Sequence, residues 1–206
     1  MIATRKTILG TVLMLSFIFC VSCPGRTYLM VDYTVPPATR LLSGQTVRVL
    51  VVDQRADKSV LTPAASDQFS AFADRYSLAW VMPDSERVLA GEHDVTNMFR
   101  ESFKKRLTQM GATVSLRSQS DIVVLTINLT DMKIDLQNRK WMVGLSYDAE
   151  LAKDSRVLSR EQVRGNAERV RIVGRKGADM ALSEIFTDAT NRLDLVKMFT
   201  AAKLIP

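Results

Sequence analysis

Two segments in the second half of the chain alternate apolar and polar residues. Apolar side chains occupy every second position in residues 123–129 and again from Trp141 to Leu151. Successive side chains of a strand point to opposite faces of a sheet, so each segment predicts a strand with one covered face and one face in water. Residues 138–140 separate the segments and are polar enough for a turn. The pattern therefore predicts an antiparallel hairpin.

Two other segments repeat apolar residues at helical spacing. The first follows Asp94, a suitable N-cap, and ends before Gly111, which suits the position after a helix C-terminus. Each stripe predicts a helix with one buried face. The first stripe consists of Val95, Met98, Phe99, Phe103, Leu107 and Met110, and the second of Ala178, Leu182, Ile185, Phe186, Ala189, Leu193 and Val196.

Shorter patterns complete the domain. The valine-rich residues 46–52 are apolar on both faces, as in a central strand, and residues 78–82 and 113–116 predict short strands. Residues 157–173 are much more polar, which is typical of an edge strand. Residues 54–92 predict a long loop, interrupted by one short helix with the helically spaced residues Phe69, Phe72, Ala73 and Tyr76.

Apart from the short helix and the strand at residues 78–82, these elements follow one another in the order β–α–β–β–β–β–α. The order predicts an α+β fold, with a mostly antiparallel sheet and two helices packed on one face, in a single domain over residues 45–206. Without residues 1–22 the chain keeps 184 residues, a length that suits one domain with a hydrophobic core.

Residues 1–22 predict a signal peptide for export. Arg5 and Lys6 precede an apolar run, and no acidic residue occurs before Asp32. The run is shorter than the about 20 apolar residues that a membrane-spanning helix needs. Charged residues interrupt every later apolar run. We therefore expect a mature chain that is attached to a membrane through its N-terminus alone.

Both cysteines lie at the end of this apolar run. Cys20 and Cys23 form a C-x-x-C, but no strand precedes them as in a redox motif, and the chain has too few Cys and His residues for a zinc site. Val21, Ser22 and Cys23 resemble a bacterial lipobox, although Cys20 stands where that pattern usually has leucine. The resemblance implies acyl chains on Cys23 that anchor the protein to a membrane. The alternative is an ordinary secreted protein that is cut nearby.

The residues after Cys23 indicate which membrane holds the protein and how its domain is connected to the anchor. Inner-membrane retention usually requires Asp after the cysteine, and this chain has Pro24. We therefore expect the outer membrane of a two-membrane bacterium, with the domain facing the periplasm. Residues 23–44 contain three prolines and predict an extended, lipid-anchored tether. Leu29 and Tyr33 are apolar enough for part of this tether to pack on the domain.

The whole domain resembles the YajG-type envelope lipoproteins, whose function is uncharacterised. The resemblance covers residues 45–196 and rests on the lipobox, the proline-containing tether, Asp53-Gln54-Arg55 after the valine-rich strand, and the LTQMGA that ends the first helix. Between Lys58 and His93 this chain is longer than that family. Accessory lipoproteins of lipid and lipopolysaccharide transport machines have a similar architecture, an analogy of fold alone.

The sequence carries no pattern typical of an enzyme. His93 is the only histidine, and neither a G-x-S-x-G nor a glycine-rich phosphate loop occurs. We expect no catalytic residue, no metal site and no cofactor. The whole chain has a net charge of +6, and residues 1–22 contribute two cations, which leaves +4. This modest charge, on an exported chain, does not indicate a nucleic-acid partner.

Two polar clusters are candidate binding sites. Asp53, Arg55 and Asp57 would share one face of an extended segment, either as a surface for a protein partner or as an Arg–carboxylate pair that fixes a turn. The edge strand is basic, which indicates either a solvated edge or a contact surface for anionic lipid or lipopolysaccharide phosphate. The candidate contact residues of this strand are Arg160, Arg164, Arg169 and Arg171.

We therefore expect a lipid-anchored, non-enzymatic domain that binds a protein partner in the cell envelope. The alternative is an accessory lipoprotein that handles lipid or lipopolysaccharide directly. An enclosed apolar groove between sheet and helices would favour the alternative, and a filled core would favour the interaction domain.

Overall fold

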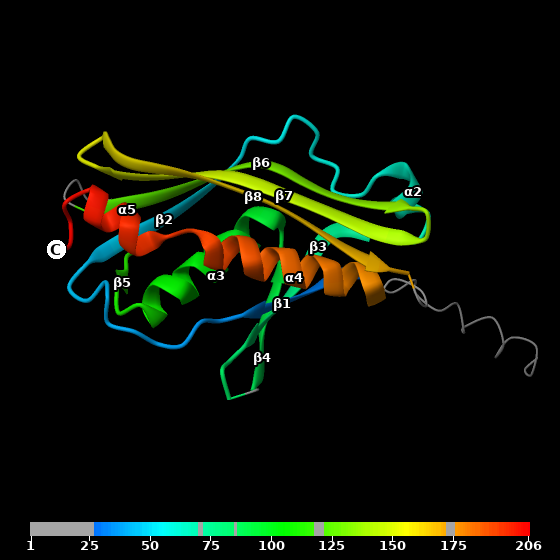
Figure 1. Cartoon of the computed structure of the whole chain (residues 1–206), viewed down its shortest axis with the longest axis horizontal. Coiled ribbons are helices and arrows are strands. Elements are labelled where there is room, and N and C mark those ends of the chain that lie inside the picture. The colour runs from blue at the N-terminus through cyan, green and yellow to red at the C-terminus, as the bar shows by residue number, and fades with distance from the viewer. Residues whose placement is uncertain (1–26, 70–71, 85, 118–121, 172–175) are drawn as a thin grey trace, which may run out of the picture.

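The computed structural model describes residues 27–69, 72–84, 86–117, 122–171 and 176–206. Its larger sheet has five strands in the order β5-β2-β6-β7-β8 (Figure 1). Strand β2 runs parallel to both neighbours, whereas β6, β7 and β8 are antiparallel. The strands are β2 (Thr46–Asp53), β5 (Thr113–Val114), β6 (Val123–Gln137), β7 (Lys140–Lys153) and β8 (Arg156–Val170).

A smaller sheet has three strands in the order β1-β3-β4, with β1 (Thr27–Thr34) parallel to β3 (Phe72–Val81) and β4 (Arg87–His93) antiparallel to it. The helices are α2 (Pro63–Ser66), α3 (Val95–Gln109), α4 (Lys176–Arg192) and α5 (Leu195–Ala201). Helices α3 and α4 lie on the same face of the larger sheet, and β1 runs beside α4 (Figure 1). The molecule is thus an α+β domain.

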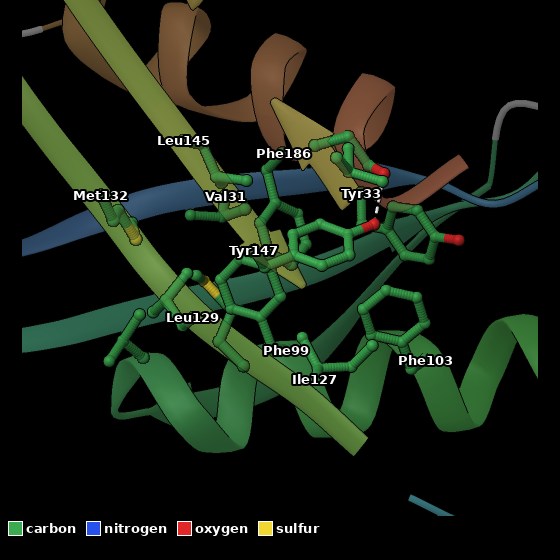
Figure 2. Close-up of a cluster of buried hydrophobic side chains, with 14 of the residues drawn as sticks. Val31, Tyr33, Phe99, Phe103, Ile127, Leu129, Met132, Leu145, Tyr147 and Phe186 are labelled. Atoms are coloured by element: carbon green, nitrogen blue, oxygen red, sulfur yellow. Dashed lines mark hydrogen bonds between the residues drawn. The ribbon is translucent and has the colours of Figure 1, made fainter. Parts of the chain in front are cut away.

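The space between the larger sheet and the helices is filled by aromatic side chains (Figure 2). Phe99 of α3 contacts Phe186 of α4 edge to face, with ring centres 4.9 Å apart. Tyr147 of β7 lies edge to face against both Phe99 and Phe103, and its hydroxyl donates to the carbonyl of Ala189 at 2.7 Å. All four aromatic side chains are fully buried. The core is therefore closed at this level.

Polar side chains of α4 accept hydrogen bonds from the backbone amides along the outer edge of β1. Asp179 accepts from the amide of Met30 at 3.0 Å, Ser183 from Asp32 at 2.9 Å, and Thr187 from Thr34 at 3.0 Å. Four residues of a helix rise about 6 Å and two residues of a strand about 6.6 Å. Every fourth residue of α4 can therefore stay opposite every second residue of β1. The helix thereby protects an edge that would otherwise pair with another strand.

The hairpin, both helices and the edge strand follow the sequence predictions. Asn138 and Arg139 form the β6–β7 turn with positive φ, and Asp94 and Gly111 cap α3 as expected. The second apolar stripe is interrupted where Asp194 caps α5, because the side chain of Asp194 accepts from the amide of Lys197. The larger sheet is not purely antiparallel, since β2 is parallel to β5 and β6.

The short helix expected at Phe69 to Tyr76 is wrong. Phe72 and Tyr76 belong to β3, and the only short helix of the described 54–92 residues is α2. Residues i and i+4 share a face in a strand as well as in a helix, so the spacing was ambiguous. Asp74 has a φ of +53°, which a helix does not accept. Strand β4 was missed in the same segment.

Part of the segment expected as a tether, residues 23–44, lies within the folded structure. Residues Thr27–Thr34 form β1, with Leu29, Val31 and Tyr33 fully buried, and Leu42 is buried as well. Alternation of these apolar residues is a strand pattern that the prolines obscured. The domain therefore already includes Thr27.

Candidate interaction surfaces

Arg55 and Asp53 form a buried turn directly after β2. The Nε and Nη2 atoms of Arg55 donate to the two carboxylate oxygens of Asp53 at 3.0 and 2.9 Å, and the Arg55 amide also donates to Asp53. Arg55 is only 4% exposed. The bidentate pair therefore fixes the turn, and the Arg55 guanidinium does not face a partner in this conformation.

Asp57 does not join that pair. Its carboxylate contacts Nζ of Lys133 on β6 at 2.5 Å and accepts from the amide of Ser59. Two backbone bonds between residues 60–62 and Ile134 continue this contact along β6. The segment after β2 thus covers the part of β6 that β2 does not reach. Asp57 is exposed, while Asp53 is mostly covered, so the three predicted residues do not form one surface.

Replacing Asp53 with asparagine is expected to reduce the loss of stability in acid. The hydrogen bonds from Arg55 lower the pKa of Asp53 to about 2, whereas an unperturbed aspartate titrates near about 3.9. A lowered folded-state pKa gives stability that is present above the unfolded value and is lost as the pH falls toward about 2. Urea unfolding is measured at several pH values between about 5 and about 2. The free energy of unfolding of Asp53→Asn should therefore fall less steeply with decreasing pH than that of the wild type. Asp67→Asn, at an exposed carboxylate, should keep the wild-type slope.

The basic residues of β8 are divided between two faces of the sheet. Arg160 lies opposite Glu150 and forms an ion pair with it at 3.0 Å, and Arg164 lies opposite Ser146 on the same outer face. Arg169 lies opposite the buried Trp141 and pairs with Glu184 of α4. Strand alternation places residues of even and odd number on opposite faces. Arg160, Arg164, Arg169 and Arg171 are therefore not one continuous contact surface.

A hollow of 680 Å³ lies where the β6–β7 turn, the end of β8 and the start of α4 meet. Val170 and Met180, which line it, are 61% and 53% exposed. Gly177 stands close to the indole of Trp141: a Cβ at this position would approach the ring within 2.8 Å. The other lining residues are Lys140, Glu168, Arg169 and Lys176.

The single histidine of the chain lies against the backbone of its own strand. His93 ends β4, and its Nε2 lies 3.3 Å from the carbonyl of Ala90. Within the described ranges, no three His, Cys, Asp or Glu side chains gather closely enough to hold a metal ion. None of the helices among these residues is long and apolar enough to cross a bilayer. Cys23, the predicted lipidation site, lies outside the described residues.

Sequence reasoning missed Arg106, a buried charge on α3. Its guanidinium donates to the carbonyls of Thr190 at 2.5 Å, Asn191 at 3.2 Å and Leu193 at 2.6 Å. These carbonyls lie at the end of α4 and in the link to α5. Burial lowers the pKa of Arg106. The only signal in the sequence was that Arg106 continues the stripe of Phe99 and Phe103 at helical spacing.

The sequence matches no protein-family model and no curated protein. A solved structure with a similar fold is a Xanthomonas campestris protein of the DUF330 family, with a TM-score of 0.55 and 15% identity over 84% of this chain and 97% of that one. The likeness shows the fold alone. It leaves the resemblance to the YajG-type lipoproteins as a prediction.

Two lipoprotein structures are more distant. The minor lipoprotein from Acinetobacter baumannii has a TM-score of 0.42 and 10% identity, over 83% of this chain and 97% of that one. The rare lipoprotein B from Shewanella oneidensis has a TM-score of 0.41 and 9% identity, over 76% of this chain and 98% of that one.

Proposed function

We propose that this protein is a lipid-anchored domain of the bacterial cell envelope that binds a protein partner and has no enzymatic activity. The anchor is the lipidated Cys23, and the domain faces the periplasm from the outer membrane. The filled core is the observation that carries this proposal over lipid handling. Phe99, Phe186 and Tyr147 occupy the space in which an acyl chain would have to lie.

The uncovered outer face of β6, β7 and β8 is the surface that we assign to the partner. Helices α3 and α4 cover its other face (Figure 1). The outer face is polar and already ordered, with an Asp148–Gln162 hydrogen bond at 2.8 Å beside the Glu150–Arg160 pair. Arg164, near the middle of the edge strand β8, is exposed and forms no ion pair among the described residues. An ordered polar face with a free cation suits an acidic patch on a protein.

Photo-crosslinking in the native envelope tests this function. A photo-reactive residue in place of Arg164 is expected to capture one defined protein. The same residue in place of Leu89, which is 62% exposed on β4 of the smaller sheet, is expected not to capture it. Capture of lipid or lipopolysaccharide alone at position 164 would contradict the proposal and support the lipid-handling alternative. Equal capture at both positions would mean that the outer face is not the binding surface.

A further inference from the structure

The connection between the predicted anchor and the folded domain is very short. Three residues separate Cys23 from Thr27, where β1 begins. Four Cα–Cα steps reach at most about 14 Å, even in a fully extended chain. Given the lipidated Cys23 of the proposed function, Thr27 must therefore lie close to the membrane surface. A domain held in this way has one end next to the bilayer.

The elements that share this end with Thr27 follow from their pairing. Thr27 lies opposite Phe72 at the start of β3. Because Met30 donates to Asp179 and Thr34 to Thr187, β1 and α4 run in the same direction, so the start of β1 lies beside the start of α4. Val170 at the end of β8 lies opposite Lys140 at the start of β7. Figure 1 shows these starts and ends at one extremity of the elongated molecule.

The surface at this end combines exposed apolar side chains with cations. Val170 and Met180 line the 680 Å³ hollow together with Lys140 and Lys176. A cation beside exposed aliphatic groups is the composition that membrane interfaces bind, because phosphates contact the charge and the acyl boundary covers the apolar groups.

Carboxylates at the same end neutralise part of this charge. Glu168 pairs with Lys140 at 3.1 Å, and Glu184 pairs with Arg169. Asp179 accepts from the amide of Met30, as described above. Lys176 is exposed and pairs with no carboxylate among the described residues, and the same holds for Arg139 in the β6–β7 turn, so both cations can contact a lipid phosphate. The attraction is therefore modest, and the exposed Val170 and Met180 supply the other contribution.

We propose that this end, formed by Val170, Met180 and Lys176, is a membrane seat that rests on the surface of the bilayer in which Cys23 is anchored. The other end of β8, at Arg156, lies about 45 Å away along the strand. Electrostatic attraction to lipid decays within about 8 Å at physiological salt, so Arg156 and Arg160 do not contribute. The sheet then projects from the membrane and presents its outer face to the periplasm.

Spin-label accessibility on vesicles tests the seat. The mature lipidated protein is reconstituted into phosphatidylethanolamine–phosphatidylglycerol vesicles, with a nitroxide on Met180→Cys or, as the matched control, on Val157→Cys at the far end of β8, where the native side chain is 45% exposed. Lipidation blocks the thiol of Cys23 and Cys20 leaves with the signal peptide, so the introduced thiol is the only reactive one. Power saturation compares the accessibility of each label to oxygen and to a water-soluble nickel chelate.

The membrane seat predicts a severalfold higher oxygen-to-nickel accessibility ratio at position 180 than at position 157. Equal ratios on protein whose Cys23 peptide carries acyl chains by mass spectrometry would overturn the seat and leave the anchor intact. An unmodified Cys23 would instead contradict the proposed function, and the seat with it.

Discussion

Replacing Arg106 with methionine is expected to lower the free energy of unfolding by about 3 kcal/mol, because two buried carbonyls and one partly buried carbonyl lose their donor. Arg106 is 7% exposed, and its guanidinium donates to the carbonyls of Thr190, Asn191 and Leu193. Each buried acceptor without a partner costs about 1–3 kcal/mol. Removing the charge also removes its desolvation cost, which offsets part of the loss.

Thermal unfolding of the Arg106 variant should occur roughly 6–12 °C below that of the wild type, for a domain of this length. Arg106→Lys retains a charge but cannot reach three acceptors with the same geometry. Its unfolding temperature should therefore lie between those of Arg106→Met and the wild type. Arg100→Met is the matched control on the same helix, since the guanidinium of Arg100, within the described ranges, donates to the side chain of Asn97 alone. A methionine variant at position 106 that is as stable as the wild type would show that the end of α4 does not depend on this guanidinium.

Replacing Phe99 with alanine is expected to lower the free energy of unfolding by about 3–5 kcal/mol, the usual cost of truncating a buried phenylalanine. Phe99 is fully buried, and its ring lies edge to face against Phe186 and Tyr147. Its removal loses the burial of the ring and these aromatic contacts, and it leaves a cavity in a packed core. Urea unfolding of the purified mature domain measures the change.

Leu89→Ala is the control for this experiment. Leu89 is 62% exposed on β4, so its truncation should change the stability by less than about 0.5 kcal/mol. A small effect at Phe99, together with increased binding of a fluorescent fatty acid, would contradict the filled core. It would indicate that the space between sheet and helices is a ligand cavity, as the lipid-handling alternative requires.

The sequence predicted the elements whose periodicity is long and unambiguous. Strands β6 and β7 and helices α3 and α4 each repeat one apolar pattern over many residues, and the caps Asp94 and Gly111 mark the ends of α3. The smaller sheet could not be predicted in this way. Phe72 and Tyr76 fit helix and strand equally well, and β1 was hidden among prolines that are typical of a tether.

The candidate sites were harder to predict because they depend on long-range pairing. The Asp53–Arg55 pair was one of the two interpretations left open, and the contact of Asp57 with Lys133 joins residues 76 positions apart. The basic residues of β8 were grouped by their nearness in sequence, yet Arg160 and Arg169 face opposite sides of the sheet. The buried Arg106 had no local partner at all, since its three acceptors lie more than 80 positions away.

Metabolic labelling with a clickable palmitate tests the lipid anchor most directly, because it separates the two cysteines of the C-x-x-C. The protein is expressed with its natural N-terminus in a two-membrane bacterium as the wild type, Cys20→Ala and Cys23→Ala. We expect the label on the wild type and on Cys20→Ala, and none on Cys23→Ala. Label that persists on Cys23→Ala, or a wild-type protein without label, would contradict a lipid anchor at Cys23.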